Sequence, residues 1–69
     1  MKLSARNVLA GKVLVVETGA TTAHVRLELQ GGGTVTASIT NEAAEELALK
    51  VGDQAYAVIK ASDVMIGKD

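Results

Sequence analysis

The sequence predicts an all-β domain with one short helix, arranged as an OB-like, five-stranded Greek-key barrel. Two observations lead to this fold class. Short apolar or alternating segments recur along the chain with turn-forming residues between them, as in small barrels. One helical pattern interrupts them after the third strand, which gives the order βββαββ. Because proline is absent and no linker is present, we expect a single domain over residues 1–69.

The first predicted strand is the nearly continuous apolar run from Val8 to Val16. Such a run is typical of a strand buried on both faces, and Gly11 within it indicates a bend or bulge. Residues 18–20 are expected to turn the chain into a second strand over residues 23–29, where apolar and polar side chains alternate strictly. That alternation predicts a strand with one face in the core.

The glycine triplet at residues 31–33 permits the positive φ angles of a tight reversal. It predicts a hairpin leading into a third strand, in which Val35, Ala37 and Ile39 alternate with hydroxyl side chains. The triplet lacks the lysine and helix start of a phosphate-binding loop, so a nucleotide site is disfavoured.

The segment from Thr40 to Ala48 is rich in helix formers and predicts one short helix. Either Thr40 or Asn41 is expected to be its N-cap. Leu47 and Leu49 are expected to anchor the helix on the core.

Residues 52 and 53 predict a turn, after which residues 54–60 are expected to form the fourth strand. Residues 64–66 are expected to finish the barrel as a fifth strand after a kink. An open antiparallel sheet is the alternative. Barrel closure, or exchange of a terminal strand between protomers, would remove exposed sheet edges.

Composition narrows the class of function. The chain is 48% hydrophobic with Tyr56 as its only aromatic residue, and a chain of 69 residues buries only about 60% of its unfolded surface, so we expect self-association. The absence of cysteine and the single histidine disfavour a bare metal centre. A net charge of −1 disfavours nucleic acid, and the lack of a long apolar run disfavours membrane insertion and favours a cytoplasmic protein.

Two short polar motifs, Ser4-Ala5-Arg6-Asn7 and Lys60-Ala61-Ser62, supply two cations and two hydroxyl groups. A guanidinium fork, an ammonium and neutral donors suit a tetrahedral dianion and do not suit a metal cation. Backbone amides at the predicted helix start, from Thr40 to Ala43, could add donors. Taken singly, each of these residues could equally be an ordinary surface group, a turn residue or a helix cap.

The same motifs resemble those of the molbindins, the small molybdate-binding Mop domains. The similarity extends over nearly the whole chain, in the order and spacing of that family. It rests on Ser4–Asn7, Leu9, Gly11–Val13, Ser38–Thr40, Leu47–Leu49, Gly52, Ala57–Ser62 and Val64.

The resemblance implies an OB-like barrel that assembles as a homohexamer, a trimer of dimers, and binds molybdate or tungstate between subunits. It implies no catalysis and no organic cofactor, with molybdenum present only as its oxyanion. The residues carried over as oxyanion ligands are Ser4, Arg6, Thr40, Ala43 (through its backbone N–H), Lys60, Ala61 and Ser62.

The function predicted from the sequence is therefore intracellular binding and storage or buffering of molybdate or tungstate. A regulatory oxyanion-sensing module and a nucleic-acid-binding OB module are the alternatives. An enzyme is the least favoured class, because no paired carboxylates and no nucleophile with a base are present.

Overall fold

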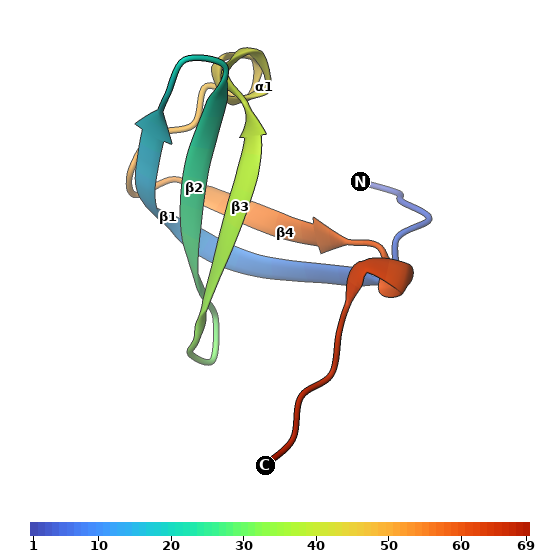
Figure 1. Cartoon of the computed structure of the whole chain (residues 1–69). Helices are drawn as coiled ribbons and strands as arrows, with labels where there is room; N and C mark the ends of the chain where they lie inside the picture. Colours follow the sequence, from blue (N-terminus) through green and yellow to red (C-terminus); the bar gives the residue numbers. More distant parts are fainter.

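The computed structural model describes residues 1–69 and is mostly β-structure with one short helix, which confirms the predicted fold class (Figure 1). Four strands form one antiparallel sheet in the order β3-β2-β1-β4. The sheet curls, and a two-stranded ribbon of β1 and β4 extends away from the β2–β3 hairpin (Figure 1). The elements are β1 (Asn7–Thr18), β2 (Thr22–Leu29), β3 (Thr34–Thr40), α1 (Asn41–Glu46), β4 (Gln54–Ile59) and the 3₁₀ turn η1 (Ala61–Asp63).

Strand β1 organises the sheet because it pairs with two different strands along its 12 residues. Its first half, Asn7 to Lys12, pairs with β4, and its second half, from Gly11 onward, pairs with β2. The register with β2 shifts between Val13 and Val15, which marks a β-bulge. A bulge increases the local twist of a strand. This bulge lies just after the residues where β1 changes its partner from β4 to β2.

The sequence predicts a bend or a bulge at Gly11. The bulge alternative is wrong in position, since the register shift lies two to four residues later. Gly11 has a different role, because it belongs to both pairings at once. A Cβ built on this residue would lie 2.6 Å from the carbonyl oxygen of Glu28, well inside van der Waals contact. Gly11 therefore permits the close approach of β1 and β2 at the point where the sheet folds over.

The core lies on the concave face of the sheet and is small. Val13 is fully buried and packs with Val25, Leu27 and Ala57, and inward-facing residues of β3 surround this group. The strict alternation predicted for β2 is confirmed, with every second residue from Ala23 to Leu27 buried.

The prediction that the first strand is buried on both faces is wrong for the single chain. Val8, Leu9 and Leu14 on β1 remain exposed. The apolar run is continuous because both faces carry apolar side chains, but nothing within one chain covers the second face. The surplus apolar surface is what a further copy of the chain could cover.

Helix α1 is shorter than predicted, and Thr40 is its N-cap. The Thr40 Oγ1 atom accepts a hydrogen bond from the Ala43 backbone N–H at 3.0 Å. Leu49 packs against the core as predicted, whereas Leu47 is 66% exposed and does not anchor the helix.

The helix ends in a Schellman motif without the usual glycine. The Leu49 N–H donates to the Ala44 carbonyl at 3.2 Å, and the Ala48 N–H donates to the Glu45 carbonyl at 2.9 Å. Ala48 takes the left-handed conformation that this motif requires, with φ of 50°. An alanine in this position carries a steric cost that a glycine would avoid.

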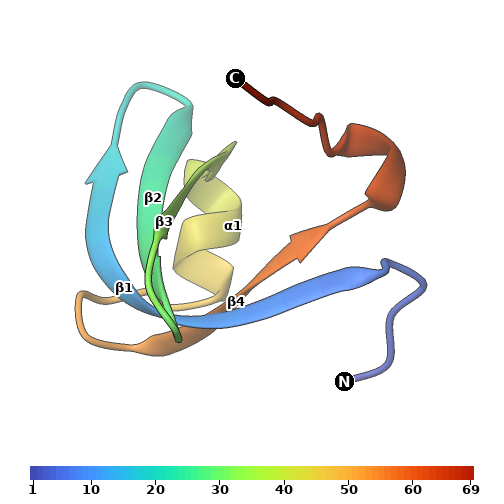
Figure 2. The ribbon, with the colours of Figure 1, turned by 90° about the horizontal axis from the view of Figure 1, so that it is seen from below.

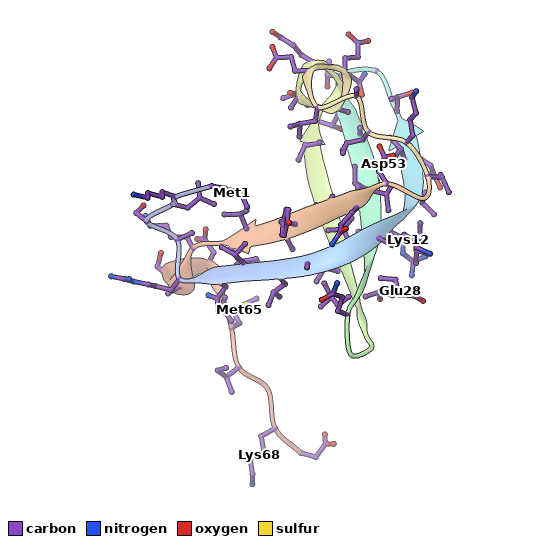
Figure 3. All side chains as sticks on the ribbon, turned by 180° about the vertical axis from the view of Figure 1, so that it is seen from behind. Met1, Lys12, Glu28, Asp53, Met65 and Lys68 are labelled. Atoms are coloured by element: carbon purple, nitrogen blue, oxygen red, sulfur yellow. The ribbon has the colours of Figure 1, made fainter.

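The fifth strand predicted at residues 64–66 does not form within the chain. After η1 these residues pair with no strand, and the tail projects away from the sheet, with Met65 near the end of the ribbon and Lys68 farther out (Figures 1 and 3). The sheet is consequently open between β3 and β4, which are its two edge strands. The chain supplies no strand of its own between β3 and β4.

We expect Gly11→Ala to destabilise the fold by about 1–3 kcal/mol, because the added methyl group must displace the Glu28 carbonyl. Urea unfolding followed by circular dichroism measures this loss. Gly67→Ala is the matched control, since a Cβ there meets no atom within 4 Å. Equal stabilities of the two variants would contradict the packing role of Gly11.

Replacing Ala48 by glycine should stabilise the domain by about 1 kcal/mol, because it relieves the left-handed backbone at the end of α1. For a domain of this size the melting temperature should rise by about 4–8 °C, measured by differential scanning calorimetry. A lower melting temperature than that of the unmodified protein would show that the Schellman geometry carries no strain.

Candidate functional site

The two predicted cations lie at the free end of the β1–β4 ribbon. Asn7 pairs with Ile59, and the Asn7 Nδ2 atom donates to the Ile59 carbonyl at 3.1 Å. Arg6 precedes Asn7 and Lys60 follows Ile59, so the two cations flank the last pair of the ladder, one on each segment. Neither residue is itself paired in the sheet. Arg6 and Lys60 therefore lie at the same end of the ribbon within one protomer.

The two hydroxyl groups lie in the segments that flank these cations. Ser4 is two residues before Arg6. Ser62 lies in η1, the turn that directly follows Lys60. The turn of η1 is held by the Asp63 N–H, which donates to the Lys60 carbonyl at 2.9 Å. We call Ser4, Arg6, Lys60, Ala61 and Ser62 the ribbon tip.

All five residues of the ribbon tip are exposed. No side-chain hydrogen bond of the structure involves them, so their donors are available to a ligand. The carboxylate of Asp63, the next residue in the chain, offsets part of the positive charge. The ribbon tip is thus an open group of donors with a net positive charge.

The helix start, which carries the predicted ligands Thr40 and Ala43, lies at the other end of β1. Thr40 pairs with Thr22, and the Asn41 side chain donates to the Gly19 carbonyl at 2.8 Å, beside the turn that follows β1. The full length of β1 therefore separates the helix start from Arg6, and Figure 2 shows α1 and the ribbon tip apart. A single chain does not bring all the predicted ligands together.

The hydrogen bonds of the helix start change what it can offer to an anion. The Ala43 N–H, predicted to be a ligand, already donates to Thr40 Oγ1. The Thr40 hydroxyl hydrogen remains able to donate, while the Asn41 Oδ1 atom is buried without a partner and can only accept. With only six residues, α1 has few aligned peptide dipoles, so Thr40 is the better donor of this segment.

The larger of two main cavities, of about 680 Å³, lies on the concave face between β3 and β4. It is almost entirely apolar, and none of the seven predicted ligands lines it. Its wall includes Val35 and Ile39 of β3, and Ala55, Ala57 and Ile59 of β4. The cavity thus opens between the two edge strands of the sheet.

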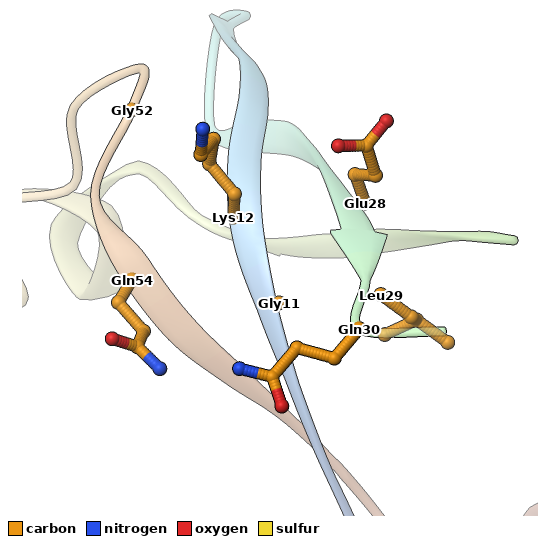
Figure 4. A pocket seen from close by; sticks show the side chains of 7 residues that line it. All are labelled: Gly11, Lys12, Glu28, Leu29, Gln30, Gly52 and Gln54. Carbon is orange, nitrogen blue, oxygen red and sulfur yellow. The ribbon is translucent and has the colours of Figure 1, made fainter. Parts of the chain in front are cut away.

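The smaller cavity, of about 330 Å³, lies where β1 passes from β4 to β2. Figure 4 shows Lys12, Glu28, Gln30 and Gln54 around the backbone of Gly11. Lys12 and Glu28 are cross-strand partners, so the single cation faces a carboxylate, which is unfavourable for a dianion. Sequence reasoning did not single out this pocket, because residues from three strands meet there only through the register.

No group of three or more His, Cys, Asp or Glu side chains comes together in a way that could hold a metal ion. The structure also contains no helix with the length and apolar character needed to cross a membrane. The ribbon tip holds two cations and two hydroxyl groups, all exposed, at one end of the β1–β4 ribbon.

Comparison with known proteins identifies relatives over nearly the whole chain. Residues 3–66 match the model of the TOBE domain. The chain is 50% identical over 66 residues to molybdenum-pterin-binding protein 3 of Clostridium pasteurianum. The aligned region covers 96% of this chain and 97% of that protein.

Solved structures show the same fold. MopII from Clostridium pasteurianum (apo2) is similar with a TM-score of 0.91 and 45% identity, covering 97% of this chain and 100% of that one. ModG, described as a cytoplasmic molybdate-binding protein and solved with molybdate bound, has a TM-score of 0.89 and 55% identity, covering 94% of this chain and 46% of that one.

These similarities confirm the resemblance drawn from the two polar motifs, and they agree with the curled sheet and short helix of the structure. The chain belongs to the TOBE domain family, in its molbindin (Mop) group.

Proposed function

We propose that the protein binds molybdate or tungstate as the intact oxyanion, and that it stores or buffers this ion in the cytoplasm. The observation that carries the proposal is the pairing of Asn7 with Ile59, which puts Arg6 and Lys60 at the same end of the ribbon, with Ser4 and Ser62 in the same two segments. The relatives named for molybdenum or molybdate binding support it.

The donor set accounts for the choice of ligand. Two cations can neutralise the two charges of a tetrahedral dianion, and the serine hydroxyls and the backbone around Ala61 can donate to its oxygens. Binding needs no organic cofactor, and the proposed role is binding without catalysis. Molybdate and tungstate share shape and charge, so the proposal includes both.

The site is proposed to be completed by a neighbouring protomer, which would supply Thr40 from its helix start. Charge supports this arrangement, because α1 carries three glutamates, Glu42, Glu45 and Glu46, and no basic residue in its last turn. An acidic helix in one protomer complements the basic ribbon tip of the next. Leu47 is exposed beside the helix and could pack in the same contact.

Assembly is proposed to close the open barrel, in a homohexamer built as a trimer of dimers. Val64, Met65 and Ile66 form an apolar tail, with Met65 and Ile66 at least 90% exposed. The cavity between β3 and β4 is apolar and bordered by two unpaired strand edges. A second copy's tail is the proposed occupant of this cavity, where it would act as the fifth strand.

A regulatory oxyanion-sensing role is the alternative for the same site. A nucleic-acid-binding role is not proposed. Stacking platforms need several aromatic side chains and a basic groove, whereas Tyr56 is the only aromatic residue and the net charge is −1.

Titration calorimetry with molybdate, tungstate and sulfate tests the ligand. Molybdate and tungstate should bind well above sulfate, and Arg6→Ala or Lys60→Ala should each weaken binding by about 10- to 100-fold, as expected for a lost charged hydrogen bond. Arg26→Ala removes an exposed cation of β2 away from the ribbon tip and should change affinity by less than about twofold. Similar weak binding of all three anions would reject the proposal.

Sedimentation velocity tests the assembly. Met65→Glu places a charge in the apolar tail and should shift the protein from the hexamer to smaller species, because burying an unpaired carboxylate is costly. Lys68→Gln changes the net charge by the same amount farther along the tail and should leave the hexamer intact. A monomeric unmodified protein, or a Met65→Glu variant that assembles normally, would contradict the proposed strand exchange.

A further inference from the structure

The hydrogen bond from Asn7 to Ile59 is the only side-chain hydrogen bond of the structure that joins β1 to β4. It spans 52 residues of sequence at a distance of 3.1 Å and is partly buried. It adds to the backbone pairing of the same two residues at the end of the ladder. The last pair of the ribbon is therefore tied by both backbone and side chain.

Beyond this pair, the two segments that carry the ribbon tip have no other hydrogen bond to the body of the protein. Residues 1–6 take part in none, and the bonds of residues 60–69 stay within and next to η1. Arg6 and Lys60 thus stand on separate chain ends whose spacing depends on the Asn7–Ile59 pair.

We propose that Asn7 is a positioning residue of the oxyanion site, acting through Arg6 by holding the first residues of β1 against the end of β4. This inference rests on the proposed function of the ribbon tip. Asn7 is not one of the predicted ligands, and one N–H of its Nδ2 atom donates to the Ile59 carbonyl.

Loss of the carboxamide would let the end of the ladder fray. The freed residue must then be ordered again when the ligand binds, and ordering one backbone residue costs free energy equivalent to about a tenfold change in affinity. The charge and the donors of the ribbon tip are unchanged, so the loss reflects position alone.

Calorimetric titration with molybdate tests the inference on Asn7→Ala and on Asn7→Val, a stronger strand former that also lacks the donor. Both should bind about tenfold more weakly while circular dichroism and sedimentation show the unmodified fold and assembly. Asp53→Ala is the matched control, because it also removes one side-chain hydrogen bond to the backbone. The Lys50 N–H donates to the Asp53 carboxylate at 3.0 Å in the loop before β4. The affinity of Asp53→Ala should change by less than about twofold.

A double-mutant cycle with Arg6→Ala separates positioning from general stability. If Asn7 acts through Arg6, adding Asn7→Ala to Arg6→Ala should weaken binding by less than about threefold further. A full tenfold loss in both backgrounds, or no loss in either Asn7 variant while the unmodified protein binds molybdate, would overturn this inference alone. An unmodified protein that binds no molybdate would overturn the proposed function as well.

Discussion

The structure depends on one strand that serves two partners. β1 pairs with β4 through its first half and with β2 through its second half, and the two pairings overlap at Gly11 and Lys12. The overlap requires close contact between backbones, which only a residue without Cβ permits at Gly11. The first residues of β1, Asn7 to Ala10, pair with β4 and not with β2. The β1–β4 ribbon therefore projects from the sheet and carries the ribbon tip away from the core.

The same geometry leaves the fold incomplete within one chain. The inner face of the curled sheet is covered by a small group of buried aliphatic residues, and the opening between β3 and β4 remains apolar and uncovered. A domain of this length has a small core, contains no cysteine to form a disulfide, and brings together no group of three or more His, Cys, Asp or Glu side chains. The proposed assembly would bury the exposed apolar surface, including the apolar tail, against further copies of the chain.

Assembly and ligand binding are linked in this view. The cations of the ribbon tip and the Thr40 hydroxyl occupy opposite ends of the long strand, so an anion that contacts all of them must bridge protomers. A ligand that binds only the assembled state stabilises that state by mass action. Arg6 and Lys60 are like charges at the same end of the ribbon, and the bond from Asn7 to Ile59 joins β1 to β4 next to them.

Much of the local structure was determined by the sequence alone. Alternation in residues 23–29 predicted the half-buried β2, the glycine triplet predicted the hairpin, Thr40 was predicted as a possible N-cap, and the two polar motifs led to the family. These signals are local, since side-chain periodicity and backbone preferences act within a few residues. Only the tertiary structure decided where β1 changes partner and why that point needs Gly11. It also decided that residues 64–66 pair with no strand of their own chain and that Thr40 and Arg6 lie at opposite ends of β1. These features depend on which distant strands pair and in which register. The periodicity of the sequence predicts which face of a strand a residue lies on, but it does not predict which other strand or chain packs against that face.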